Sequence, residues 1–257
     1  DSFFITTKVG LPRNETTGLY EEGATETAFL SRLEISLQRL GLDYVDILHH
    51  HGVWRREAVL YEPILKAMEK AKKEGKVRFA GISTHRNEPE AIQAAIDSKF
   101  YDVVATAYNF RQKHQEEMNQ AIAKAAEAGL GIIGMKAMGG SPRSNYGRDR
   151  QPEDAQVALK WVFQNPNIHM VIAGFTGPTV EGGGVWTEIR QAQANVADSS
   201  KHPEFMGTVV FVPTHTFVRP PDKSPGGWPC HEHDNPETYL LVGKASGEAM
   251  KKLLEET

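Results

Sequence analysis

The 257-residue sequence contains a single cysteine, Cys230, and this scarcity excludes several kinds of site. One cysteine cannot form a disulfide within the chain, and it cannot supply the four thiolates that hold an iron–sulfur cluster. A chain without internal disulfides is typical of a reducing compartment, so we expect a cytoplasmic location.

Long hydrophobic runs and clusters of basic residues are also missing. The apolar segment Leu130–Met135 is far shorter than the roughly 20 residues needed to cross a bilayer. The first residues lack the basic head and cleavage site of a signal peptide and run straight into a strand pattern, so we expect the chain to begin inside a domain. The formal net charge is -4, without a run of Lys or Arg, which argues against a phosphate-backbone binder. We therefore expect a soluble protein that binds neither nucleic acid nor membrane.

What the sequence does contain is a repeated alternation of short apolar runs with longer segments of helical spacing. One such helix is expected to begin at Thr25 or Thr27, either of which can cap it, and to end at Gly41. Alternation of this kind favours parallel strands joined by right-handed crossovers. The predicted fold class is α/β, a partial (β/α)8 TIM-type barrel of six parallel strand–helix units. The six predicted strands are Phe3–Lys8, Tyr44–His51, Val77–Ser83, Val103–Tyr108, Gly131–Met135 and His169–Ala173.

The composition changes beyond Thr176, where a glycine-rich linker at 177–184 is expected to separate a barrel domain (1–176) from a tail (185–257). The edge strands at Phe3 and His169 would expose unpaired backbone, which favours self-association. An αβα tail could cover one edge with a seventh strand. Its predicted elements are a helix at Val185–Val196, a strand at Thr208–Val212 and a helix at Glu237–Glu255.

Polar residues follow the predicted strands at the points where they end. In a parallel barrel these ends meet at one rim, where ligands and catalytic groups collect. Alternation places Lys8 on the face of its strand that looks into the barrel. A lysine buried there can lower the pKa of a neighbouring phenol or bind an anion, whereas a plain strand-end lysine would reach into water.

The second strand ends in three histidines, of which His49 and His51 share a face. A histidine at this position can hydrogen-bond a carbonyl oxygen or bind a metal, but without a nearby carboxylate the pair is a weak metal site. We therefore expect no metal. The alternative is one packed histidine beside two partly exposed ones.

Later strand ends offer hydroxyls, an amide and an aromatic face, while glycines at Gly139, Gly140 and Gly174 allow close approach of the backbone. As a set they suit a nicotinamide-type ring better than a metal ion. The side chains concerned are Ser83, Thr84, Tyr108 and Asn109.

Several ordered segments resemble the aldo-keto reductase family, from Phe3 to about Thr176. They are Phe3–Gly10, Ser36–Ile47 with His51, Glu74–Arg78 leading to Gly81–Thr84, and Ala158–Val162 leading to Val171–Gly174. The resemblance implies a (β/α)8 barrel that transfers hydride from NADPH or NADH to a small carbonyl substrate. It uses a tyrosine acid, a lysine, an aspartate and a histidine.

Lys8 and His51 match two of these four catalytic groups. The family's aspartate and tyrosine belong to units upstream of the first residue, and Tyr20 lies in a different loop, so we expect impaired hydride transfer. The cofactor-binding positions implied by the resemblance are Ser83, Thr84, Tyr108, Asn109, Lys136 and Gly174.

The cofactor positions depart from the family pattern in several places. Thr84 stands where many members carry asparagine, Ala105 where many carry glutamine, and Lys136 where many stack a tyrosine on the nicotinamide. The 177–184 segment has no basic residue for the adenosine phosphate, and Glu181 would repel it. Cofactor binding is therefore expected to be weak.

The tail resembles the C-terminal part of SGNH-type hydrolases, especially carbohydrate O-acetylesterases, at Val185–Gln193, Gly207–Val212 and Thr238–Gly243. That resemblance implies that His231 or His233 activates a serine, with Asp234 as orienter. No Gly-Asp-Ser block precedes the tail. Two alternatives stay open: the segment Cys230–Asp234 binds zinc, or the chain is a non-catalytic recombined or truncated product.

Overall fold

A computed structural model describes residues 4–137, 152–171, 185–225 and 235–255. The chain divides into two compact units. The sheet unit comprises Phe4–Met135 and Asn165–Ile172, and the helical unit comprises Asp1–Phe3, Lys136–Gln164 and Ala173–Thr257. The linker predicted at 177–184 lies outside the described residues, so that domain boundary stays a prediction.

The sheet unit contains six strands in one sheet, and every neighbouring pair is parallel. The strands stand in the sheet in the order in which they occur in the chain, which confirms the predicted α/β class with six parallel strands. Their bounds are β1 Thr6–Val9, β2 Val45–His50, β3 Val77–Thr84, β4 Val103–Ala107, β5 Gly131–Met135 and β6 Met170–Val171.

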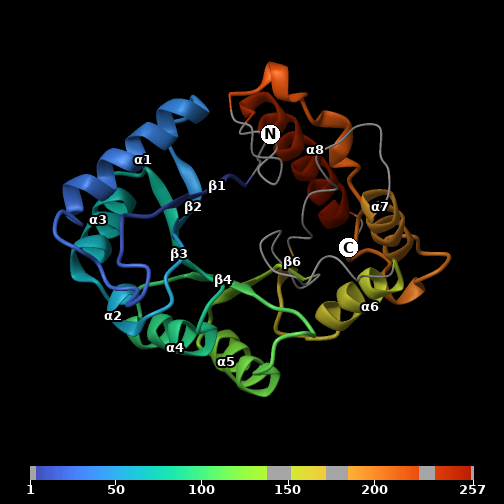
Figure 1. Cartoon of the computed structure of the whole chain (residues 1–257), viewed down its shortest axis with the longest axis horizontal. Helices are drawn as coiled ribbons and strands as arrows, with labels where there is room; N and C mark the ends of the chain where they lie inside the picture. The colour runs from blue at the N-terminus through green and yellow to red at the C-terminus, as the bar shows by residue number, and fades with distance from the viewer. Residues whose placement is uncertain (1–3, 138–151, 172–184, 226–234, 256–257) are drawn as a thin grey trace. The chain divides into compact units, whose positions relative to one another are not determined.

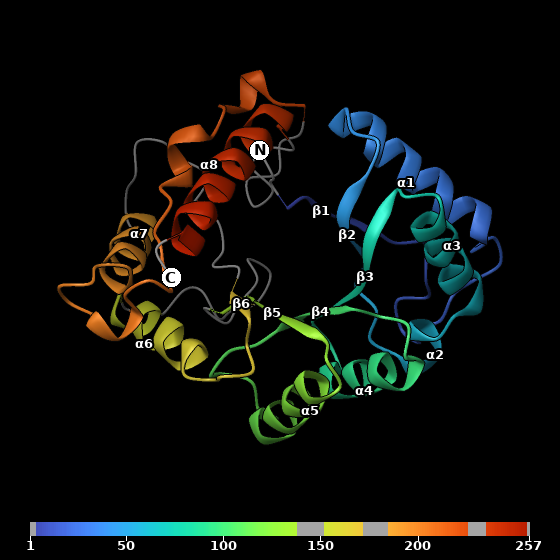
Figure 2. The ribbon, with the colours of Figure 1, turned by 180° about the vertical axis from the view of Figure 1, so that it is seen from behind.

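Helices connect the strands and cover one face of the sheet. Figures 1 and 2 show α1, α3, α4 and α5 on the same side of the curved sheet. Their apolar side chains form the core against the strands, with Phe29, Met68 and Ile92 fully buried. The helices of this unit are α1 Glu26–Leu40, α2 Arg56–Val59, α3 Glu62–Lys73, α4 Glu88–Ser98 and α5 Gln115–Glu127.

Helix α1 shows why its bounds could be predicted. The Thr25 side chain accepts a hydrogen bond from the Ala28 N–H, which satisfies a donor of the first turn. At the other end Gly41 takes a left-handed conformation with φ of 65°, where glycine has no Cβ penalty.

The strands alternate between two environments. On the helix-covered face, Leu48, His50 and Ile82 have no exposed surface. On the opposite face, called the open face below, Phe4 is 68% exposed and Lys8 is also exposed. Side chains that point to the open face at the strand ends are therefore those that a ligand can approach within this unit.

The helical unit contains α6 Pro152–Phe163, α7 Val185–Val196 and α8 Pro236–Glu255, together with short 3-10 turns at Pro203–Phe205, Thr214–Phe217 and Pro221–Lys223. The helices predicted at both ends of the tail are confirmed, α7 with the same bounds. No helix among the described residues combines the length and apolar character required to cross a membrane.

The strand predicted at Thr208–Val212 is wrong. The N–H groups of Thr208 and Val209 turn back to the carbonyl of Phe205, and no strand of the described residues pairs with this run. A β-branched composition favours a strand only where a neighbouring strand supplies hydrogen-bond partners. Where it is described, the tail therefore consists of helices, short 3-10 turns and irregular segments, and the expected αβα pattern and its seventh strand are not present there.

Candidate active site at the carboxyl ends of the strands

Lys8 and His51 lie on the open face at adjacent strand ends. Lys8 is in register with His49, and the His51 N–H donates to the Val9 carbonyl to continue the pairing of β1 with β2. Although part of the Lys8 side chain is exposed, desolvation by its surroundings lowers its pKa. The pKa of His51 falls to about 4, first through desolvation and then through the positive charges of Lys8 and Arg13. The two predicted catalytic residues are therefore within electrostatic reach of each other, and His51 is neutral near pH 7.

His49 shares the open face but is a packed histidine. Its Nδ1 lies 3.2 Å from the Ile82 carbonyl oxygen, and since a carbonyl only accepts, Nδ1 carries the proton. The residue is 2% exposed, and desolvation lowers its pKa to about 4. The alternative of one packed histidine beside two partly exposed ones is wrong, because His50 is buried as well and only His51 is exposed.

His50 points to the helix-covered face, where it joins two tyrosines. The Tyr101 hydroxyl donates to the Val59 carbonyl at 2.8 Å, so its oxygen accepts from His50 Nδ1 at 3.0 Å. His50 Nε2 is then the acceptor for the Tyr20 hydroxyl. Burial raises the pKa of Tyr20 to about 12 and lowers that of His50 to about 3. The Tyr20 hydroxyl therefore serves this buried contact, away from the face that carries Lys8.

Ser83 and Thr84 end β3 on opposite faces. Ser83 lies on the open face, where its Oγ accepts the Gly52 N–H at 2.9 Å and so fixes the turn that follows His51. The Thr84 hydroxyl donates to the Arg86 carbonyl at 3.2 Å within its own loop. Of the two predicted cofactor-binding residues Ser83 and Thr84, Ser83 therefore lies on the same face as Lys8 and His51, and Thr84 lies on the other.

Tyr108 is buried, and its hydroxyl is engaged by other residues of the sheet unit. It donates to Asn119 Oδ1 at 2.6 Å and accepts from Asn165 Nδ2 at 2.8 Å. Any contact of Tyr108 with a ligand would therefore have to use the ring. The following residue, Asn109, is 7% exposed, and its Oδ1 accepts the Arg111 N–H at 3.1 Å.

The remaining predicted positions belong to the helical unit or lie outside the described residues. Lys136 belongs to the helical unit, where it is exposed and has a φ of 53°. The positions outside the described residues are Gly174, Cys230, His231, His233 and Asp234. Within the described part of the chain, no three His, Cys, Asp or Glu side chains are grouped so as to hold a metal ion.

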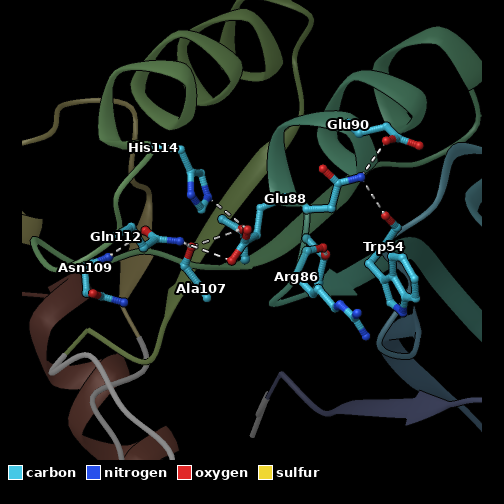
Figure 3. A network of polar contacts seen from close by, with 11 residues as sticks. Trp54, Arg86, Glu88, Glu90, Ala107, Asn109, Gln112 and His114 are labelled. Atoms are coloured by element: carbon cyan, nitrogen blue, oxygen red, sulfur yellow. Dashed lines mark hydrogen bonds and ion pairs between the residues drawn. The ribbon is translucent and has the colours of Figure 1, made fainter. Parts of the chain in front are cut away.

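A polar network behind the rim was not predicted from the sequence (Figure 3). Glu88, at the start of α4, is 4% exposed and contacts Gln112 Nε2 at 3.1 Å and His114 Nε2 at 3.1 Å. A glutamate in the first turn of a helix is common, because the helix dipole favours it there. The local sequence does not distinguish a buried glutamate from an exposed one. The network becomes visible only where the loop after β3, with Glu88, packs against the loop after β4, with Gln112 and His114.

Comparisons with known proteins agree with the arrangement of strands. The family model described as "Aldo/keto reductase family" matches residues 1–156. L-glyceraldehyde 3-phosphate reductase of Escherichia coli (strain K12) is 34% identical over 97 residues, covering 38% of this chain and 26% of that protein. L-galactose dehydrogenase of Arabidopsis thaliana is 46% identical over 70 residues, covering 26% of this chain and 22% of that protein. These alignments span at most about a quarter of the relatives' lengths.

Among solved structures, the aldo-keto reductase AKR11C1 from Bacillus halodurans, in its holo form, aligns with a TM-score of 0.51 and 19% identity. The alignment covers 83% of this chain and 76% of that one, and at this identity it supports the fold alone. The resemblance of the tail to SGNH-type hydrolases finds no support in these comparisons. The family match over more than half of the chain, together with six parallel strands in sequential order, shows that this protein belongs to the aldo/keto reductase family.

Proposed function

We propose that this chain takes part in NAD(P)H-dependent reduction of a small carbonyl compound, with Lys8 and His51 acting on the carbonyl oxygen. The observation that supports this most directly is their common position on the open face, within reach of each other's charge. A neutral His51 can donate a hydrogen bond to the substrate oxygen, and the Lys8 ammonium stabilises negative charge that develops on it.

The side chains near these residues fit a nicotinamide carboxamide. Ser83 Oγ already accepts the Gly52 N–H and keeps its own hydrogen for donation. The Oδ1 of Asn109 accepts the Arg111 N–H, while its Nδ2 makes no hydrogen bond with the described residues. When bound, NADPH or NADH would supply the hydride. We propose that Ser83 and Asn109 bind its carboxamide.

We further propose that hydride transfer by this 257-residue chain is slow. Tyr20 and Tyr108 both have their hydroxyls engaged by other side chains, and burial raises the pKa of each. Neither is therefore placed to protonate a substrate oxygen beside Lys8. General-acid catalysis contributes about 10²- to 10⁴-fold, so hydride transfer that neither tyrosine assists would have a low rate.

Titration with NADPH followed by reaction with an activated aromatic aldehyde tests the proposal. We expect quenching of protein fluorescence and slow oxidation of NADPH that depends on the aldehyde. Lys8→Met should lower this rate by about tenfold or more, whereas Lys113→Met, at an exposed position, should leave it unchanged. Absence of quenching would contradict cofactor binding. Fast turnover that Lys8→Met abolishes would contradict the proposed slow rate, and turnover insensitive to Lys8→Met would contradict the assigned role of Lys8.

A further inference from the structure

A buried carboxylate joins two loops at the rim of the sheet unit. Glu88 begins α4 after strand β3, and Gln112 and His114 follow strand β4. Figure 3 shows the three side chains converging, with Gln112 between Glu88 and the backbone of Ala107 and Asn109. A carboxylate that is 4% exposed is stable only where such donors compensate for its lost hydration.

Gln112 can adopt only one amide orientation in this network. Its Oε1 accepts the Asn109 N–H at 3.1 Å, and its Nε2 donates to the Ala107 carbonyl at 3.2 Å and to Glu88 at 3.1 Å. A flipped amide would place oxygen against two acceptors and nitrogen against a donor. The Glu88 carboxylate therefore reinforces the orientation in which Gln112 contacts the backbone after β4.

This orientation fixes Asn109 at the point where the sheet ends. The pairing of this segment with β5 continues to the hydrogen bond from the Tyr108 N–H to the Met135 carbonyl. The next N–H, that of Asn109, donates to Gln112. The Asn109 side chain is held in turn by the Arg111 N–H. Backbone and side chain of Asn109 are thus both fixed before any ligand arrives, which reduces the entropy lost on binding.

We propose that Glu88 is a positioning residue of the cofactor site, acting through Gln112 to hold Asn109 ready for the nicotinamide carboxamide. The inference rests on the function proposed above, since it assigns Asn109 a cofactor contact. Glu88 itself touches no ligand in this scheme. His114 completes the network by contacting the second carboxylate oxygen of Glu88 at 3.1 Å.

Three variants and one control test the role of Glu88. Glu88→Ala and Gln112→Ala break the network, whereas Glu88→Gln retains an oxygen that can accept from Gln112. Lys113→Ala changes an exposed neighbour in the same loop. The measurements are the Kd for NADPH by fluorescence titration and, without cofactor, hydrogen exchange at the Asn109 amide. Exchange at amides of strand β3 reports whether each variant is folded.

Loss of one such hydrogen bond corresponds to about a tenfold change in an equilibrium. We expect Glu88→Ala and Gln112→Ala to weaken NADPH binding about tenfold and to accelerate exchange at Asn109 by a similar factor. Glu88→Gln should fall closer to the wild type, and Lys113→Ala should match it. Slow exchange at β3 should persist in all variants.

Two results would overturn the inference while leaving the proposed function intact. One is accelerated exchange at Asn109 with an unchanged Kd, which would make the network purely structural. The other is a wild-type Kd and wild-type exchange in Glu88→Ala. If the wild-type chain itself fails to bind NADPH, both the proposed function and this inference are contradicted. The exchange data then still show whether Glu88 holds the loop that contains Asn109. If Glu88→Ala does not fold, Gln112→Ala and Glu88→Gln still test the positioning role of Glu88.

Discussion

The imidazole of His49 occupies the space into which a side chain on Gly81 would extend. A Cβ placed on Gly81 would lie 2.7 Å from His49 Nδ1 and 3.1 Å from the Val103 carbonyl oxygen. Real Cβ atoms do not approach other heavy atoms at the first of these distances. Glycine is thus needed at this position for space, and its presence allows Nδ1 to reach the Ile82 carbonyl.

Gly81→Ala is expected to destabilise the protein by about 1–3 kcal/mol, because the new methyl group forces His49 or the backbone to move. Gly131 offers a matched control in strand β5, since its nearest neighbour would lie 3.7 Å from a new Cβ. Gly131→Ala should leave stability equal to or slightly above that of the wild type. Urea unfolding of the two variants measures the difference. Equal midpoints would show that the His49 ring relaxes without cost.

As the pH falls, the protein should begin to lose stability at a pH well above the range in which carboxylates titrate. The folded-state pKa values of His49 and His50 are lowered to about 4 and about 3, mainly by burial, so both histidines are neutral when folded. Between their unfolded pKa of about 6.5 and these values, the unfolded state binds more protons. Stability is therefore greatest above pH 6.5 and falls as the pH decreases towards 4.

The expected slope is on the order of 1 kcal/mol per pH unit for each of these histidines. Measuring the free energy of unfolding at several pH values from 7.5 to about 4.5 gives that slope. His50→Gln should make it shallower while lowering stability at pH 7. A flat profile in the wild type would mean that these imidazoles are protonated in the folded state.

Tyr101→Phe removes the hydroxyl that donates to Val59 and accepts from His50. Both partners would then be buried without their hydrogen bonds, and a loss of about 1–3 kcal/mol is expected. Tyr44→Phe is the control, because Tyr44 is 47% exposed. Thermal unfolding should separate the two variants. Equal stability of both would show that the hydroxyl of Tyr101 contributes nothing net.

Asp46 contributes to stability at the opposite end of the strands. The residue is 2% exposed, accepts the Ile5 N–H at 2.8 Å and pairs with Arg78 at 2.6 Å. Asp46→Ala should cost about 1.5–3 kcal/mol, since hydrogen bonds to a charged group are lost and a backbone donor is left unpaired. Asp97→Ala, which breaks an exposed pair with Arg56, should have a much smaller effect. Urea unfolding distinguishes them, and a comparable loss in both would contradict the importance of burial.

Much of the sheet unit could be predicted because its signals are local. Thr25 and Gly41 are capping residues, and they mark the two ends of helix α1 in the sequence. The alternation of side chains along a strand places His50 on one face of the sheet and His49 and His51 on the other. The run Thr208–Val212 also has a β-branched local signal, but no strand of the described residues lies beside it. Its prediction was wrong because strand formation depends on a partner that local sequence does not specify.

The candidate site was predictable to a lesser degree. Strand ends identified Lys8 and His51, and the register places both on one face. The hydroxyl of Tyr108 and the carboxylate of Glu88 could not be placed in advance, because their partners Asn165 and Gln112 come from other segments of the chain. Hydrogen bonds between distant residues depend on how loops pack, which single-sequence patterns do not encode.

The sequential order of strands β1 to β5 has a consequence for how the chain acquires its structure. Each new strand adds beside the one synthesised just before it, so each crossover closes a loop of only 18 to 35 residues. The entropy lost per step is small, and native contacts form between segments that leave the ribosome in succession. The sheet can therefore grow outward from its amino-terminal strands during translation, each completed pair serving as the template for the next.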